Sequence, residues 1–296
     1  MDYILTTQDL TKMYGKVYAV KDINLHIKPG EIYGLIGRNG AGKTTIMRVI
    51  SGLSSATSGS YELHGENKNG VGVLIEAPGI YPNKSAKENI RLKCIAMGCN
   101  DEAYIDDLLL TVGLENTGNK KAGSFSLGMR QRLGIALALV GDPKVIVLDE
   151  PINGLDPQGI VEVRKTLEKL KEEKGITIMI SSHILDELSK LADTFGIIHE
   201  GRLIDEFNMQ DLQERCGEYV MVSTDNNEKA LELISGMGYK DVNIDEGMIK
   251  ISDGIEDTIA INKKLVSNNI GVKEIFIKST SLEDYYLSMT GGNHNG

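Results

Sequence analysis

A glycine-rich segment near residue 40 limits what this chain can fold into more than any other feature. The segment reads Gly37-Arg38-Asn39-Gly40-Ala41-Gly42-Lys43-Thr44-Thr45, with two glycines five residues apart followed by Lys and Thr. An apolar run over 32–36 precedes it, and apolar residues at helical spacing follow it over 46–50. This order predicts a buried strand, a tight loop and a helix.

The composition of this loop is typical of a phosphate-binding site. Glycines let the backbone curl so that successive N–H groups point inward, and a helix N-terminus adds roughly half a positive charge. Lys43 would reach the β- and γ-phosphates of a nucleotide, and the Thr44 hydroxyl would bind Mg²⁺. A glycine-rich turn with a chance Lys-Thr pair is the alternative, but the flanking strand and helix argue against it. The sequence therefore predicts a nucleotide site at residues 37–45.

The overall composition argues against two other kinds of protein. A formal net charge of -10 is unfavourable for a general nucleic-acid binder. Trp is absent and aromatic residues make up only 5% of the chain, so stacking platforms for single strands are not expected either. No segment approaches the roughly 20 apolar residues that a membrane-spanning helix needs. Action at a membrane would therefore require a partner.

The first 205 residues alternate between apolar strands and helices. Strands are expected over 3–7, 19–27, 32–36, 61–64, 71–74, 144–148 and 176–180, and residues 82–140 are mainly helical. Continuous apolar strands that alternate with helices are typical of a parallel sheet. We therefore predict an α/β domain over 1–205 that includes a helical subdomain over about 82–140. Tyr14 is expected in a loop.

The remaining residues carry no further phosphate chemistry. A linker is expected over 206–218, followed by a strand, helix, strand, strand, helix and strand over 219–277. This order matches the ferredoxin-like pattern, and a looser α+β arrangement of short elements is the alternative. With a short helix at 281–287, these elements make up a C-terminal α+β domain over 219–290, and 291–296 form a tail.

Two carboxylates end the apolar strand 144–148, and a histidine follows the next strand. Asp149 and Glu150 are thus expected at the carboxyl edge of the sheet, where α/β proteins bind ligands. An Asp-Glu pair at a strand end usually lies in a solvated loop. Because a phosphate loop lies upstream, however, we interpret this pair as a second part of the metal site. Asp149 would hold Mg²⁺ and Glu150 would orient or deprotonate water. His183 is placed to contact the γ-phosphate, although a lone histidine there is more often structural.

Taken together, these residues resemble the ATP-binding cassette subunits of ABC transporters over roughly residues 3–205. The resemblance implies a P-loop cassette with a mixed-sheet core, an antiparallel β subdomain and a helical subdomain. It implies ATP and Mg²⁺ as cofactors, with Glu150 as catalytic glutamate and His183 as switch histidine. It also implies that Tyr14, which alone would be an ordinary loop tyrosine, stacks on adenine.

The resemblance assigns further residues to a neighbouring subunit's nucleotide. Residues 124–132 are similar to the signature motif, in which Ser126 and Gly128 would cap the γ-phosphate bound to a second copy. Residues 153–156 resemble the D-loop and include Asp156. The signature reads Phe125-Ser126-Leu127-Gly128-Met129 instead of the commoner Leu-Ser-Gly-Gly-Gln, but the serine and the second glycine are kept.

A second departure lies at Glu76, where most cassettes carry glutamine. A glutamate can bind Mg²⁺ or water but cannot donate as an amide does. Glutamate here, together with residues 75–83 and 282–286, is similar to the subfamily that handles bacitracin and lantibiotics.

The resemblance implies an ATPase that forms a homodimer around two MgATP and drives export of, or immunity to, a peptide antibiotic. Its partner would be a separate membrane permease, which would hold it on the cytoplasmic face of the membrane. Residues 76–83 and the helices after them would transmit motion to the permease. The alternatives are an exporter of another substrate and a soluble cassette protein without a transporter. A third is a sensor in which the C-terminal domain binds a ligand.

Overall fold

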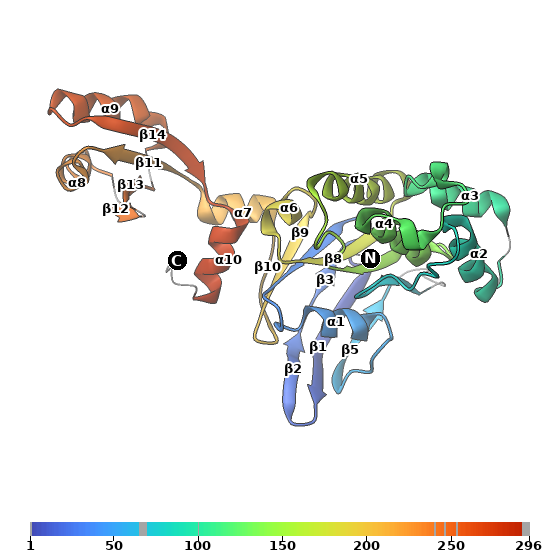
Figure 1. Cartoon of the computed structure of the whole chain (residues 1–296). Helices are drawn as coiled ribbons and strands as arrows, with labels where there is room; N and C mark the ends of the chain where they lie inside the picture. The colour runs from blue at the N-terminus through green and yellow to red at the C-terminus, as the bar shows by residue number, and fades with distance from the viewer. Residues whose placement is uncertain are drawn as a thin grey trace. The chain divides into compact units, whose positions relative to one another are not determined.

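The chain forms two compact units, Met1–Asn208 and Met209–Gly296. The structure is a computed structural model (Figure 1), and it describes residues 2–64, 70–99, 101–239, 241–245, 247–252 and 254–291. Most of the expected tail, 292–296, lies outside the described residues.

A six-stranded sheet with strand order β10-β9-β4-β8-β7-β6 forms the centre of the N-terminal unit. Its strands are β4 (Ile32–Ile36), β6 (Val71–Leu74), β7 (Val145–Asp149), β8 (Thr177–Ser182), β9 (Thr194–His199) and β10 (Arg202–Asn208). Neighbouring strands are parallel except for the antiparallel pair β9 and β10. Strands β4, β7 and β8 are buried along their whole length, which explains why their sequences are largely apolar instead of alternating.

A smaller antiparallel sheet completes the core of this unit. It contains β1 (Leu5–Tyr14), β2 (Val17–Ile23), β3 (His26–Ile27) and β5 (Ser58–Leu63), and β1 pairs with each of the other three. Helix α1 (Lys43–Ile50) joins the two sheets, because its Ile46 and Met47 belong to one buried cluster with Leu5 of β1 and Val147 of β7. The antiparallel β subdomain that the resemblance implied is therefore present.

Further helices lie along one side of the central sheet and beyond one end of it (Figure 1). They are α2 (Ala86–Ala96), α3 (Glu102–Thr111), α4 (Leu127–Leu139), α5 (Pro157–Lys174) and α6 (Leu185–Ser189), with 3₁₀ turns at Glu115–Thr117 and Ala122–Ser124. A capping box starts α2: the Ser85 hydroxyl accepts from the Glu88 N–H, and the Glu88 carboxylate accepts from the Ser85 N–H. The bond from the Ser85 backbone is the main reason that the pKa of Glu88 falls to about 2.

Several segments differ from the sequence prediction. The strand expected over 19–27 is divided between β2 and β3, and strands β9 and β10 were not expected. Tyr14, expected in a loop, is the last residue of β1, because β1 and β2 form a hairpin that pairs Tyr14 with Val17. Segment 206–218, expected as a linker, contains the end of β10 and helix α7 (Met209–Cys216). The end of β10 is ordered by its ladder with β9, in which Asn208 pairs with Thr194.

The C-terminal unit has the strand and helix order expected for a ferredoxin-like domain. After α7 come β11 (Glu218–Thr224), α8 (Asn227–Ser235), β12 (Val242–Asp245), β13 (Met248–Ile251), a 3₁₀ turn (Ile255–Asp257), α9 (Thr258–Ser267), β14 (Val272–Ser279) and α10 (Leu282–Thr290). The four strands form an antiparallel sheet in the order β12-β13-β11-β14. Ala230 and Ile234 of α8 and Ile261 and Leu265 of α9 pack with the sheet in a separate buried core.

The contact between β6 and α4 generates a stability prediction. A Cβ on Gly72 of β6 would overlap the carbonyl oxygen of Ala138 in α4. Gly72→Ala should therefore lower the free energy of unfolding of the N-terminal unit by about 1–3 kcal/mol, as for other overpacked sites. Urea denaturation of the full chain measures this change. Gly79→Ala is the matched control, because a Cβ there meets nothing within 4 Å; equal effects of both variants would contradict the packing argument.

Candidate functional site

The glycine-rich loop connects β4 to α1 and passes close to neighbouring strands. Gly42 occupies the N-cap of α1 with φ of 114°. A Cβ on Gly37 would lie 2.6 Å from the Ile198 carbonyl oxygen, and one on Gly42 would lie 2.5 Å from Val20 Cγ1. Glycine is therefore required at both positions by space, and at Gly42 by backbone conformation as well.

The loop borders a cleft of about 490 Å³, within the usual size range of small-ligand sites. The cleft is lined by Val17, Tyr18, Ala19, Arg38, Asn39, Gly40, Gly42, Lys43, Thr44, Thr45, Asp149, Glu150, Glu200 and Gly201. The fold thus brings most of the predicted phosphate loop together with the predicted Asp-Glu pair. Tyr18 and Glu200 also line the cleft, although no sequence pattern pointed to them.

Asp149 lies at the centre of a polar network that joins three elements. The Thr44 hydroxyl of α1 donates to Asp149 Oδ2 at 2.7 Å, and the Ser181 hydroxyl of β8 donates to Asp149 Oδ1 at 2.6 Å. The Ser181 hydroxyl also accepts from the Glu150 N–H at 2.9 Å. Ser181 is fully buried and was not predicted as a site residue; its only sequence signal is a hydroxyl two residues before His183.

Glu150 is held between a cation and an imidazole. Its Oε1 lies 3.4 Å from Lys43 Nζ, and its Oε2 lies 2.7 Å from His183 Nδ1. Lys43 is buried, and its Nζ also donates to the Gly37 carbonyl at 2.6 Å. Oε1 of Glu150 is buried and accepts no hydrogen bond from any described residue. A buried acceptor without a donor is suited to receive a hydrogen bond from water.

The residues present fit a magnesium ion that is bound mainly through nucleotide phosphates. Mg²⁺ prefers oxygen ligands and is usually held by one or two carboxylates plus substrate phosphates and water. The adjacent Thr44 hydroxyl and Asp149 carboxylate supply such ligands. In the described part of the chain, no group of three or more His, Cys, Asp or Glu side chains would hold a metal. A metal at this site would therefore need phosphate or water oxygens in addition to the Thr44 and Asp149 side chains.

Glu76, the third predicted metal ligand, is placed differently. Its carboxylate forms an ion pair with Arg48 of α1, and its side chain is 65% exposed. It does not belong to the lining of the cleft. The structure therefore brings Thr44 and Asp149 together and leaves Glu76 outside that pair.

The predicted signature and D-loop residues gather at the starts of two neighbouring helices. Ser126 is the N-cap of α4 and accepts from the Met129 N–H, and Asp156 is the N-cap of α5 and accepts from the Gly159 N–H. The helices meet closely there, since a Cβ on Gly128 would lie 3.4 Å from Gly159 Cα.

These residues do not border the cleft of their own chain. Ser126, Gly128 and Asp156 are absent from the described residues that line it. His183 is not among them either, but it contacts Glu150, which lines the cleft. Tyr14 is also absent from the lining; its ring is half-exposed and lies 5.2 Å from Lys12 Nζ.

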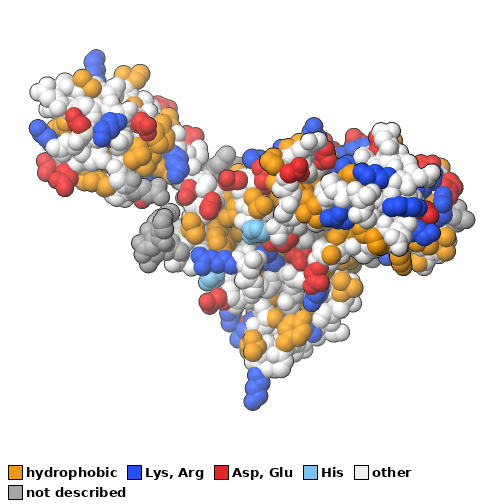
Figure 2. All heavy atoms as spheres, in the orientation of Figure 1, with side chains coloured by type: hydrophobic (Ala, Val, Ile, Leu, Met, Phe, Trp, Pro, Cys, Tyr) orange, Lys and Arg blue, Asp and Glu red, His pale blue; other side chains and the backbone are white. Residues whose placement is uncertain are grey.

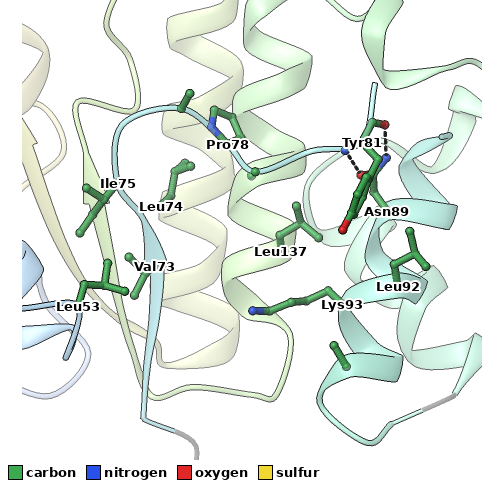
Figure 3. Close-up of a pocket in the computed structure, with 14 residues that line it drawn as sticks. Leu53, Val73, Leu74, Ile75, Pro78, Tyr81, Asn89, Leu92, Lys93 and Leu137 are labelled. Atoms are coloured by element: carbon green, nitrogen blue, oxygen red, sulfur yellow. Dashed lines mark hydrogen bonds between the residues drawn. The ribbon is translucent and has the colours of Figure 1, made fainter. Parts of the chain in front are cut away.

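A second hollow, of about 450 Å³, lies between the segment after β6 and helices α2 and α4 (Figure 3). We call it the apolar groove; it is lined by Leu53, Val73, Leu74, Ile75, Ala77, Pro78, Gly79, Tyr81, Asn89, Leu92, Lys93, Ala96, Gly134 and Leu137. Asn89 fixes its rim, because its amide accepts from the Tyr81 N–H at 2.7 Å and donates to the Tyr81 carbonyl at 3.2 Å. Leu53, Tyr81 and Leu92 are exposed.

Comparison with known proteins gives the family. Residues 20–153 match the family described as ABC transporter. The bacitracin transport ATP-binding protein BcrA of Bacillus licheniformis is 42% identical over 306 residues, which cover 100% of this chain and 100% of that protein. The chain belongs to the ABC transporter family. It is an ATP-binding subunit and an ABC ATPase, as the sequence resemblance predicted.

Two further similarities refine this placement. The lantibiotic transport ATP-binding protein SrtF of Streptococcus pyogenes is 47% identical over 206 residues, which cover 68% of this chain and 89% of SrtF. The ABC cassette MJ0796, solved as a dimer in a post-hydrolysis state bound to ADP and Pi, matches with a TM-score of 0.61 and 25% identity. That match covers 69% of this chain and 98% of MJ0796. The predicted likeness to bacitracin and lantibiotic transport proteins is confirmed.

Within the residues that the structure describes, no helix is both long and apolar enough to cross a bilayer.

The Ser181 network generates a prediction about ATP hydrolysis in this ABC ATPase. Ser181→Ala removes one donor to Asp149 and the acceptor for the Glu150 N–H. Loss of such a supporting hydrogen bond should reduce ATP turnover by about 10–100-fold. Steady-state phosphate release measures the effect. Ser182→Ala is the matched control, because Ser182 is equally buried but bonds to the backbone of Ile184; a loss no larger than in this control would exclude a positioning role.

Proposed function

We propose that this ABC ATPase dimerises around two MgATP and drives export of, or immunity to, a peptide antibiotic of the bacitracin or lantibiotic type. A separate permease would form the membrane path and hold the ATPase on the cytoplasmic face. The observation that carries the proposal is Glu150 held between Lys43 and His183 beside the Thr44–Asp149 pair. Full-length similarity to a bacitracin transport protein supports the substrate class.

The polar residues at and beside the cleft have proposed roles in hydrolysis that follow from their positions. The phosphate loop and Lys43 would bind the nucleotide phosphates, with Lys43 compensating their negative charge. Thr44 and Asp149 would hold Mg²⁺, which would act as a Lewis acid on the phosphoryl oxygens. Glu150 would orient or deprotonate the attacking water, because its buried Oε1 has no other donor among the described residues. His183 would keep Glu150 in place through the 2.7 Å contact.

Closure of the site would require a second copy of the chain. Ser126, Gly128 and Asp156 lie at the starts of α4 and α5, outside the cleft of their own subunit. The N-terminus of α4 carries the partial positive charge that favours a phosphate. We therefore assign these residues to the γ-phosphate bound by the partner. The dimeric, ADP-bound structure of the related cassette MJ0796 supports this arrangement.

The apolar groove is our proposed docking site for the permease. Its walls come from α2, α4 and the segment after β6, so it borders the predicted transmission segment 76–83. Lys93 extends into it from α2, among side chains that are otherwise largely apolar (Figure 3). A short apolar segment of the permease with a carboxylate or a helix C-terminus for Lys93 fits this chemistry. Glu76 stands at the start of the same segment, so its ion pair with Arg48 would lie beside that contact.

The hydrolysis mechanism predicts the behaviour of Glu150→Gln. The amide keeps the size of the side chain but cannot accept a proton, so turnover should fall by about 10²–10⁴-fold while ATP binding persists. Phosphate release and binding of a fluorescent ATP analogue measure the two properties. The variant should also accumulate as an ATP-bound dimer in size-exclusion chromatography. Wild-type turnover would remove Glu150 from the mechanism.

The docking proposal predicts that a mutation in the apolar groove impairs transport but leaves ATP hydrolysis by the isolated protein intact. Leu92→Asp places a charge in the apolar groove and should abolish co-purification with the permease while the isolated ATPase keeps its activity. Resistance to bacitracin and to a lantibiotic, titrated in a sensitive host that expresses both subunits, should fall to the level of Glu150→Gln. Leu110→Asp on α3 is the control, because Leu110 is similarly exposed but lies outside the groove.

The same experiment tests the substrate class. Wild-type transporter that confers no resistance to either peptide would contradict the antibiotic proposal. Full resistance from Leu92→Asp would contradict the docking site.

A further inference from the structure

Strand β14 of the C-terminal unit forms an exposed apolar edge. Among the described residues, β14 pairs with β11 alone, so its other side ends the sheet. Proteins usually protect such edges with charge, proline or a covering element, and β14 carries the charged residues Lys273, Glu274 and Lys278 beside its apolar ones. Here Phe276 and Ile277 of β14 are 41% and 46% exposed, and Ile259 at the start of α9 is 80% exposed. Figure 2 shows hydrophobic side chains over the part of the C-terminal unit where Figure 1 draws β14.

The register of β14 places apolar groups on both faces of this edge. Ile275 and Ile277 stand opposite Val222 and Val220, which belong to the core beneath α8 and α9. They therefore face the helices, and they line a hollow of about 310 Å³ with Thr258, Ile259 and Asn262 of α9. Phe276 stands opposite Met221 and faces the other side of the sheet, because side chains alternate along a strand.

The charges of β14 make the strand complementary to itself. When two copies are aligned antiparallel with Phe276 opposite Phe276, Glu274 of each copy stands opposite Lys278 of the other. Ile275 then stands opposite Ile277. A shift by one residue in either direction places Lys278 opposite Lys273 or opposite Ile275, which loses the charge pairing. One register is therefore favoured over its neighbours.

We propose that β14 pairs with β14 of a second copy of this chain and joins the two C-terminal sheets into one. The contact is isologous: the same edge serves both copies, about a two-fold axis at Phe276. It provides a second dimer contact that needs no nucleotide and is separate from the closure of two cassettes around ATP. The opposite edge offers no such match, since β12 has four residues, Val242–Asp245, and no cation.

The charge pairing gives the first test, made on the full chain without nucleotide. Sedimentation equilibrium of the wild type should show a monomer–dimer equilibrium. Glu274→Lys and Lys278→Glu each convert two attractive cross-strand pairs into repulsive ones, so each should weaken dimerisation at least about tenfold. The double variant Glu274→Lys/Lys278→Glu restores opposite charges and should return the dissociation constant to within about threefold of wild type.

Two results of the sedimentation experiment would contradict β14 pairing. A wild type that stays monomeric up to about 0.1 mM would overturn the proposal, and so would single variants that dimerise like wild type. Lys43→Ala should retain this nucleotide-free dimer even though it loses ATP binding. The edge contact and the ATP-dependent dimer can therefore fail independently of each other.

A disulfide cross-link between the two copies tests the position of the proposed two-fold axis. Two Phe276→Cys side chains would face each other across it, so mild oxidation should give a disulfide-linked dimer. Ile244→Cys is the matched control, because Ile244 is 45% exposed on the opposite edge strand. Wild type gives the background from the native cysteines. Equal cross-linking of Phe276→Cys and Ile244→Cys would contradict the proposed register.

Discussion

The carboxylate of Asp149 is the group on which the arrangement of this site depends. It ends a strand that is buried over its whole length, and an ionised carboxylate in such a place is costly unless donors satisfy it. The Thr44 and Ser181 hydroxyls do so from α1 and from β8. One charged group thereby fixes a helix start and two strand ends relative to one another. The same two hydroxyls hold the carboxylate at the lining of the cleft, where we propose that it binds the magnesium ion.

The parts of the site that lie close together in sequence could be predicted without the structure. The phosphate loop is one contiguous segment, and Asp149 and Glu150 directly follow an apolar strand whose carboxyl end must lie at the ligand edge. Ser181 could not be predicted, because its role comes from the register that pairs it with Asp149 across β7 and β8. The apolar groove also required the structure, since its lining comes from four separate segments: Leu53, residues 73–81, α2 and α4.

The same distinction holds for the fold. The strand and helix order of the C-terminal unit follows from short periodic segments and was readable from the sequence. Local periodicity alone does not give the strand order: β11 lies between β13 and β14 although neither is next to it in the chain, an arrangement that follows only if the ferredoxin-like alternative is chosen. Only that order reveals that β14 is an edge strand and that Phe276 and Ile277 are exposed. The charge pattern of residues 274–278 is self-complementary in any fold. Two copies can pair through it only where this segment is an edge strand.

Backbone geometry explains how two consecutive carboxylates reach one cleft. In a regular strand Asp149 and Glu150 would point to opposite faces, because side chains alternate. Glu150 instead adopts φ of 50°, a left-handed conformation that costs a non-glycine residue on the order of 1–3 kcal/mol. The hydrogen bond from its N–H to Ser181 and the contacts of its carboxylate with Lys43 and His183 compensate this strain. The strained turn thus places the carboxylate that we propose to orient water beside the carboxylate that we propose to hold the metal.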